Sequence, residues 1–145
     1  SDRPIQHLMV FPRHTGYGMR MHGCLAISLL TLAACASEVP RHPARFEPAI
    51  EVVSMRSVDR EIEVRLSTGY TRVLASGSRW RQVGAISEGG VYASNGSTFS
   101  VEGAHVHEAY LVVKSGRLVG FYLPVERAFS PLSPDQNPTL WKEYE

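Results

Sequence analysis

The chain has 145 residues, the length of one domain, since domains usually span about 100–200 residues. Charged residues make up 20% and hydrophobic residues 43%, which excludes an intrinsically disordered chain. The formal net charge of +1 excludes the broad basic surface of a nucleic-acid-binding protein, so we expect no nucleic-acid partner. The 2 cysteines are too few for a disulfide-rich scaffold or a cysteine-only zinc site.

Residues 1–18 match no targeting pattern. The chain begins with Ser1, whereas Met19 followed by Arg20 has the charge expected at the start of a signal peptide. Met9 is an alternative start that lengthens the basic region. We therefore interpret residues 1–18 as an upstream extension or a fragment, and exclude them from the argument on the fold.

Residues 19–34 have the order of a secretory signal peptide: a basic start, an apolar run from Leu25 and small residues at the end. An apolar run of about ten residues rises about 15 Å as a helix, half of a bilayer core, so it is too short for an ordinary transmembrane span. A buried core helix is disfavoured because the run is not amphipathic and Pro40 and Pro43 follow it.

The end of this run, Leu32-Ala33-Ala34-Cys35, resembles the lipobox of bacterial lipoproteins, and the resemblance covers residues 19–35. It implies cleavage before Cys35 and lipidation of Cys35, with diacylglycerol on the thiol and a fatty acid such as palmitate on the amine. In a Gram-negative host, Ala36 implies delivery to the outer membrane with the domain in the periplasm; with a single membrane, the domain faces outward. The alternatives for Cys35 are a buried free thiol or a disulfide with Cys24.

Residues 35–48 are expected to form the lipidated cysteine and an extended tether, because Pro40, Pro43 and Pro48 interrupt the segment and no apolar periodicity is present. Without residues 1–34 the chain is close to neutral, so we expect membrane attachment to depend on the acyl chains. Processing would also leave no free thiol, which excludes cysteine catalysis and thiolate metal ligands.

Residues 49–130 are predicted to form a β domain, because apolar and polar residues alternate along most of it, as at Ile62, Val64 and Leu66. We expect strands at residues 50–56, 61–66, 71–74, 80–83, 91–92, 98–101, 104–113 and 117–126. Short strands at this spacing predict an all-β, single-domain barrel or sandwich, with an SH3-like partly open barrel favoured. No helix is expected beyond the signal, and residues 131–145 should run extended over the surface.

The strand pair at residues 104–113 and 117–126 is predicted to be central, because both of its faces are apolar. A two-residue loop at Ser115 and Gly116 would set Tyr110 opposite Phe121, whereas a left-handed bulge at Gly116 shifts the register by one residue. Within the second strand, Gly120 is expected to permit close packing by an aromatic residue such as Trp80.

His105 and His107 are the candidate metal ligands. Residues two apart on a strand project to one face, so both imidazoles would reach one ion, with Glu102 or a residue distant in the sequence as the third ligand. Glu108 faces the other way, and it must either pair with an arginine such as Arg81, Arg117 or Arg127 or lie at the solvent-exposed end of the strand, because burying a lone carboxylate costs several kcal/mol.

No catalytic constellation and no cofactor motif is evident, so we expect a protein that is not an enzyme. The favoured hypothesis is a small cell-envelope lipoprotein, attached to the membrane by its lipid anchor, with a non-catalytic β-rich binding or assembly domain. Its partner would be another envelope protein, for example in an envelope or secretion system. The alternative is a metal-binding protein or small metalloenzyme that uses His105 and His107.

Overall fold

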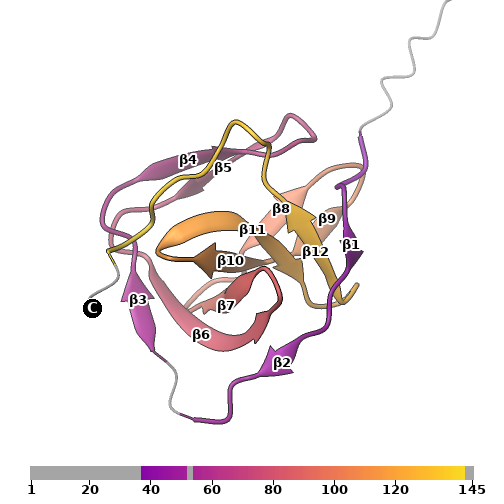
Figure 1. Ribbon diagram of the computed structural model, residues 1–145. Helices are drawn as coiled ribbons and strands as arrows, with labels where there is room; N and C mark the ends of the chain where they lie inside the picture. The colour runs from indigo at the N-terminus through magenta and orange to yellow at the C-terminus, as the bar shows by residue number, and fades with distance from the viewer. Residues whose placement is uncertain (1–36, 52–53, 143–145) are drawn as a thin grey trace, which may run out of the picture. The chain divides into compact units, whose positions relative to one another are not determined.

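The computed structural model describes residues 37–51 and 54–142, and within these ranges the fold is all-β with no helix (Figure 1). The expected fold class is thereby confirmed, whereas the signal at residues 19–34 lies outside the described residues. The strands are β1 (His42–Pro43), β2 (Glu47–Pro48), β3 (Met55–Ser57), β4 (Ile62–Arg65), β5 (Thr71–Leu74), β6 (Arg79–Ile86), β7 (Gly89–Ser94), β8 (Ser100–Glu102), β9 (Val106–Glu108), β10 (Tyr110–Lys114), β11 (Arg117–Leu123) and β12 (Ala128–Pro131).

The main sheet is antiparallel and has the order β1-β12-β11-β10-β7-β6-β2, and β3 also pairs with β6. Two hairpins, β4–β5 and β8–β9, stand outside this sheet. Figure 1 shows the sheet curled into a half barrel, with the β4–β5 hairpin lying across its open side. The domain is thus a small curled sheet closed by hairpins, and the SH3-like form of barrel in particular stays a prediction.

One face of the main sheet packs against the β4–β5 hairpin. Along β4, Ile62 and Val64 are buried while Glu63 and Arg65 are exposed, so the alternation in the sequence marks the buried face. The cluster combines aliphatic residues of the hairpin with residues from the centre of the sheet, where Leu111 is 0% and Phe121 1% exposed. We call this the inner cluster.

The other face of the sheet carries the outer cluster, formed by Ile86, Val91, Val112, Tyr122 and Phe129. Ala44 and Phe46 from the N-terminal segment pack against it. The central strands are therefore covered on both faces, as their apolar composition predicts.

Two glycines in the sheet make room for aromatic rings of the outer cluster. A Cβ on Gly84 would lie 2.6 Å from Cζ of Phe46, and a Cβ on Gly120 would lie 2.5 Å from Cε2 of Phe129. Any side chain at either position would clash with this ring and also with a backbone carbonyl of the paired strand, that of Glu47 at Gly84 and that of Ser130 at Gly120. The aromatic neighbour of Gly120 is therefore Phe129, and not Trp80, which packs in the inner cluster.

Residues 37–48, expected to be a tether, belong to the fold. β1 pairs with β12 and β2 pairs with β6, and Val39 is only 5% exposed. The prolines do not prevent this pairing, because a strand at a sheet edge leaves one side of its backbone free of ladder hydrogen bonds. Only Cys35 and Ala36 lie between the expected cleavage site and the described part of the fold.

The C-terminal residues extend the domain beyond the boundary expected at residue 130, as the N-terminal segment extends it beyond the boundary expected at residue 49. Residues 132–142 form no strand, as expected, but Leu140 and Trp141 are 1% and 4% exposed within the inner cluster. The Leu140 N–H donates to the carbonyl of Gly116 at 2.8 Å, and Trp141 makes an edge contact with Tyr92. The apolar pair at the chain end thus closes the inner cluster.

The hairpin of β10 and β11 has both features that the sequence left as alternatives, a two-residue turn and a register shift of one residue. Ser115 and Gly116 have φ of 50° and 70°, which gives a two-residue turn with Lys114 opposite Arg117. The register then shifts between Val112 and Val113, so that Tyr110 lies opposite Tyr122. Tyr110 consequently belongs to the outer face of the sheet, whereas Phe121 belongs to the inner cluster.

Of the strand expected at residues 50–56, the described residues show the end, β3. Ala49 N–H donates to the carbonyl of Val83, Ile50 is 98% exposed, and the carbonyl of Ser54 accepts a hydrogen bond from Gln82 N–H just before β3. In the described part of the chain, this edge of β6 pairs with β2 and with β3.

Candidate functional site

The two candidate metal ligands have different environments. His107 lies in β9 and is 7% exposed, whereas His105 precedes the strand and its side chain is 74% exposed. The centroids of the two imidazoles are 6.5 Å apart and their planes are nearly perpendicular. His105 lies outside the regular strand, so the rule that residues two apart share a face does not bring both rings to one point.

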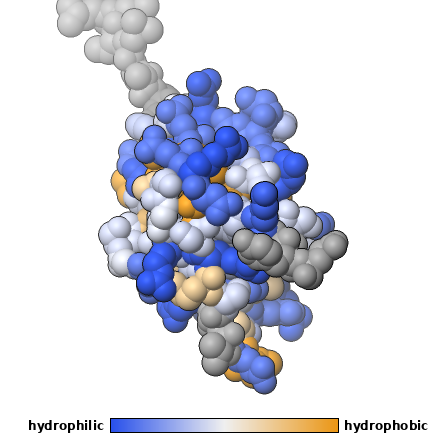
Figure 2. Space-filling view, turned by 90° about the vertical axis from the view of Figure 1, so that its left-hand side faces the viewer, coloured by the Kyte–Doolittle hydropathy of each residue, from blue (hydrophilic) through white to orange (hydrophobic). Residues whose placement is uncertain are grey.

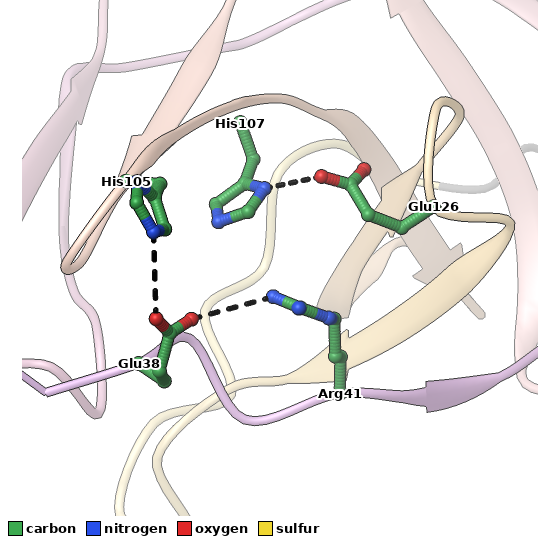
Figure 3. Close-up of polar contacts among 5 residues, drawn as sticks. All are labelled: Glu38, Arg41, His105, His107 and Glu126. Carbon is green, nitrogen blue, oxygen red and sulfur yellow. Dashed lines mark hydrogen bonds and ion pairs between the residues drawn. The ribbon is translucent and has the colours of Figure 1, made fainter.

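His107 is held by a carboxylate that the sequence did not indicate. Its Nδ1–H donates to Oε1 of Glu126, which lies in the turn between β11 and β12 (Figure 3). Burial acts to raise the pKa of the Glu126 carboxyl, but hydrogen bonds from His107 and from the backbone outweigh burial and hold that pKa below its ordinary value. The pair therefore joins β9 to the β11–β12 turn.

Glu38 links the exposed histidine to the N-terminal segment. Its two carboxylate oxygens lie 3.7 Å from Nε2 of His105 and 3.6 Å from a guanidinium nitrogen of Arg41 (Figure 3). All three side chains are solvent-accessible, so each of these ion pairs contributes at most about 1 kcal/mol. We call Glu38, Arg41, His105, His107 and Glu126 the histidine cluster.

The geometry of this cluster does not favour a metal centre. Within residues 37–51 and 54–142, no three His, Cys, Asp or Glu side chains are placed to hold one ion. Glu102, the candidate third ligand, lies 3.4 Å from the guanidinium of Arg72 instead. The contacts of the histidine cluster join the N-terminal segment, β9 and the β11–β12 turn to one another.

Glu108 lines a small polar pocket of about 150 Å³ together with Arg81 and Tyr110. Of the three arginines considered as partners, Arg81 shares this pocket, while Arg117 donates to the carbonyl of Asn137 at 3.1 Å. Burial, and then the negative charge of Glu108, raise the pKa of the Tyr110 hydroxyl above its ordinary value. The pocket therefore places charges of both signs beside a phenol that stays protonated at neutral pH.

A larger pocket of about 370 Å³ opens between the N-terminal segment and the β11–β12 turn. Phe46 and Tyr122 form its aromatic part and stack with their centroids 5.1 Å apart, and Arg45 and Arg127 also line it. We call it the Phe46 pocket. The sequence pattern Arg45-Phe46 was the available signal, but the segment looked like a tether because of its prolines.

The side of the domain that carries β3 has a pocket of about 220 Å³, lined by Met55, Arg56, Ser57, Asp59, Trp141 and Lys142. Figure 2 shows the face with β3, β4 and β5, which is mainly hydrophilic with small and separate hydrophobic areas. The exposed apolar residues of these strands and of the β4–β5 turn, Met55, Tyr70 and Val73, are only 38%, 43% and 51% exposed. Isolated residues of this kind are normal on a soluble surface.

Cys35, the candidate lipidation site, lies outside the described residues. Within the described ranges, the chain has no helix with the length and apolar character needed to cross a bilayer. No family model, curated protein or solved structure matches the chain.

Proposed function

We propose that this protein is a small bacterial cell-envelope lipoprotein, anchored through Cys35, and that its β domain is a non-catalytic binding module. The lipobox pattern Leu32-Ala33-Ala34-Cys35, which follows a basic start and an apolar run, supports the anchor. In a Gram-negative host the domain would face the periplasm from the outer membrane.

The Phe46 pocket is the observation that carries the binding role. An aromatic floor accepts an apolar side chain, and guanidinium groups bind carboxylates through paired, charge-assisted hydrogen bonds. Arg45 and Arg127 are both exposed and free to turn toward a ligand above Phe46 and Tyr122. The fitting partner is an acidic segment of another envelope protein, with an apolar side chain flanked by carboxylates.

The polar clusters support binding over catalysis. The nitrogen Nδ1 of His107 is engaged with Glu126, and Glu38 is engaged with both His105 and Arg41. These groups hold three segments of the chain together. A carboxylate on Nδ1 leaves Nε2 of a histidine able to act as a general base, but such a base has to lie beside the substrate. The Phe46 pocket is lined by Ala44, Arg45, Phe46, Tyr122 and Arg127 and contains no histidine.

Fluorescence anisotropy with two labelled peptides tests this proposal. One peptide has a phenylalanine flanked by glutamates, and the other has the same phenylalanine flanked by lysines. We expect the full chain to bind the acidic peptide and not the basic one. The double variant Arg45→Glu and Arg127→Glu should weaken binding by about tenfold to a hundredfold, as the loss of charge-assisted hydrogen bonds predicts.

The double variant Arg60→Glu and Arg65→Glu is the matched control, because both are exposed arginines that do not line the pocket. It changes the net charge in the same direction and should leave the affinity for the acidic peptide nearly unchanged. Equal binding of both peptides, or equal losses in the pocket and control variants, would contradict the proposed binding role.

A further inference from the structure

We infer that the end of the domain at which the chain enters the fold lies directly on the bilayer, with the β8–β9 turn in contact with lipid headgroups. This inference rests on the proposed anchor at Cys35 and specifies the surface that the anchor presents to the membrane. It replaces the picture of a domain lifted off the bilayer by a tether of residues 35–48.

The fold begins almost immediately after the proposed anchor. The carbonyl of Ser37 accepts a hydrogen bond from the N–H of Ala104 at 3.0 Å. A Cβ on Gly103 would lie 2.8 Å from that carbonyl oxygen and 2.9 Å from a methyl group of Val39, which is itself 5% exposed. The chain is therefore packed against the β8–β9 turn from Ser37 onward.

The length of chain before this contact limits how far the domain can stand from the lipid. Ser37 is two residues after Cys35. At about 3.3–3.6 Å for each fully extended residue, the two are at most about 7 Å apart. The headgroup region of one leaflet is about 5–8 Å thick, as the bilayer dimensions imply. An acylated Cys35 therefore holds Ser37 and its partner Ala104 within or against the headgroup layer.

The surface beside Ser37 suits this location. Val106, the first residue of β9, is an apolar side chain that is 70% exposed, and Ala104 is exposed next to it. The polar groups nearby, Glu38, Arg41 and His105, carry both signs of charge and are solvent-accessible. A headgroup layer with anionic lipids repels a strongly negative surface. A surface of small apolar groups and balanced charges is therefore compatible with it.

Polarity-sensitive labels on single cysteines test the inference. Processing would leave no other free thiol, so Val106→Cys and Ile50→Cys can each be labelled alone in the processed, acylated protein. Ile50 is 98% exposed and lies in the connection between β2 and β3, which Figure 1 shows at the end of the domain away from the entry of the chain. The vesicles contain phosphatidylethanolamine, phosphatidylglycerol and a nitroxide-labelled lipid that quenches fluorescence at the headgroup level.

We expect the label at residue 106 to be strongly quenched and the label at residue 50 to be unaffected. An insert of about 20 Gly and Ser residues between Ala36 and Ser37, which spans about 25 Å on average, should abolish the quenching at residue 106. Both labelled positions are exposed, so the substitutions should leave the midpoint of denaturant unfolding nearly unchanged.

The outcomes separate this inference from the proposed anchor. An unquenched label at residue 106 on protein that remains bound to the vesicles would overturn the inference and leave the anchor standing. Quenching that persists after the insertion would also overturn it, because the short connection would then not be the cause. If Cys35→Ser still incorporates labelled fatty acid or stays with the vesicles, the proposed anchor itself fails.

Discussion

The two faces of the central sheet are covered by different means. Phe121 and Tyr122 are neighbours on β11, yet Phe121 enters the inner cluster and Tyr122 the outer cluster. The inner cluster is closed by the β4–β5 hairpin and by the C-terminal residues. The outer cluster is closed by the N-terminal segment, whose strands β1 and β2 have 2 residues each. One face is therefore a conventional core. The other is covered by the N-terminal segment, residues 37–48, which we call the strap.

The strap has few ladder hydrogen bonds, so its position depends on individual side chains. Phe46 lies against Gly84 and stacks on Tyr122, and Arg41 is tied through Glu38 to His105. The Phe46 pocket lies where the strap meets the sheet. A face of low local stability beside a pocket is the place at which a partner can bind with local adjustment of the backbone.

The largest effect should come from the inner cluster. Phe121→Ala removes a ring that is 1% exposed, stacked on Phe99 and surrounded by aliphatic side chains. We expect it to lower the free energy of unfolding by about 3–5 kcal/mol, measured by denaturant melts. Phe46→Ala should cost clearly less, because Phe46 is only partly buried. Equal losses at the two positions would contradict the division into a core face and a strap face.

Gly84→Ala should act on the strap in particular. The added methyl group would meet the Phe46 ring and the carbonyl of Glu47, and overpacking of this kind costs about 1–3 kcal/mol. The N-terminal segment should therefore separate from the sheet, so that trypsin cuts faster after Arg41 and Arg45 while the rest of the domain stays protected. Unchanged cleavage at these arginines would show that the segment does not depend on the contact with Gly84.

Most of the core face was predictable from the sequence, because its strands alternate. Val64 alternates with exposed residues along β4, and the apolar runs of β10 and β11 predicted a pair covered on both sides. The strap was not predictable in this way, because Phe46 is one aromatic residue among prolines and arginines and shows no period. Its contact with Gly84 joins positions that are far apart in the sequence, which local patterns do not encode.

The candidate site was only half predictable, for a similar reason. The spacing of His105 and His107 drew attention to β9, but the partners of both rings, Glu38 and Glu126, come from distant segments. The bulge in the hairpin of β10 and β11 likewise depends on how the strands pack, so the loop sequence at Ser115 and Gly116 left the register open. Local residue patterns indicate strands and turns, whereas contacts between segments decide the site.

The contact between His107 and Glu126 should make the free energy of unfolding depend on pH. The pKa of Glu126 is lower in the folded state than its ordinary value of 4.5, so its charge stabilises the fold above that pH. This stabilisation is lost as the pH falls through the folded-state pKa. Glu126→Gln should cost about 1–2 kcal/mol at neutral pH, as expected for a hydrogen bond to a charged group, and much less in acid.

Denaturant melts across this range of pH measure the effect, with Glu61→Gln as a control on an exposed carboxyl group. A difference between wild type and Glu126→Gln that stays constant from neutral pH into acid would contradict the link between the carboxylate charge and stability. A cost no larger than that of the control would show that the contact with His107 does not stabilise the domain.

The smallest change in the free energy of unfolding should come from substitution of His105. The same variant also tests whether His105 and His107 bind a metal ion. Its side chain is 74% exposed and its pairing with Glu38 spans 3.7 Å, so His105→Ala should change the free energy of unfolding by less than about 0.5 kcal/mol. His107→Ala should cost more, because it leaves the carboxylate of Glu126 without its buried donor. Metal analysis of the purified wild type and both variants accompanies the melts, and we expect background levels in all three. Stoichiometric zinc in the wild type that is lost in both variants would reverse this interpretation, since it would require the two imidazoles to turn toward a common ion.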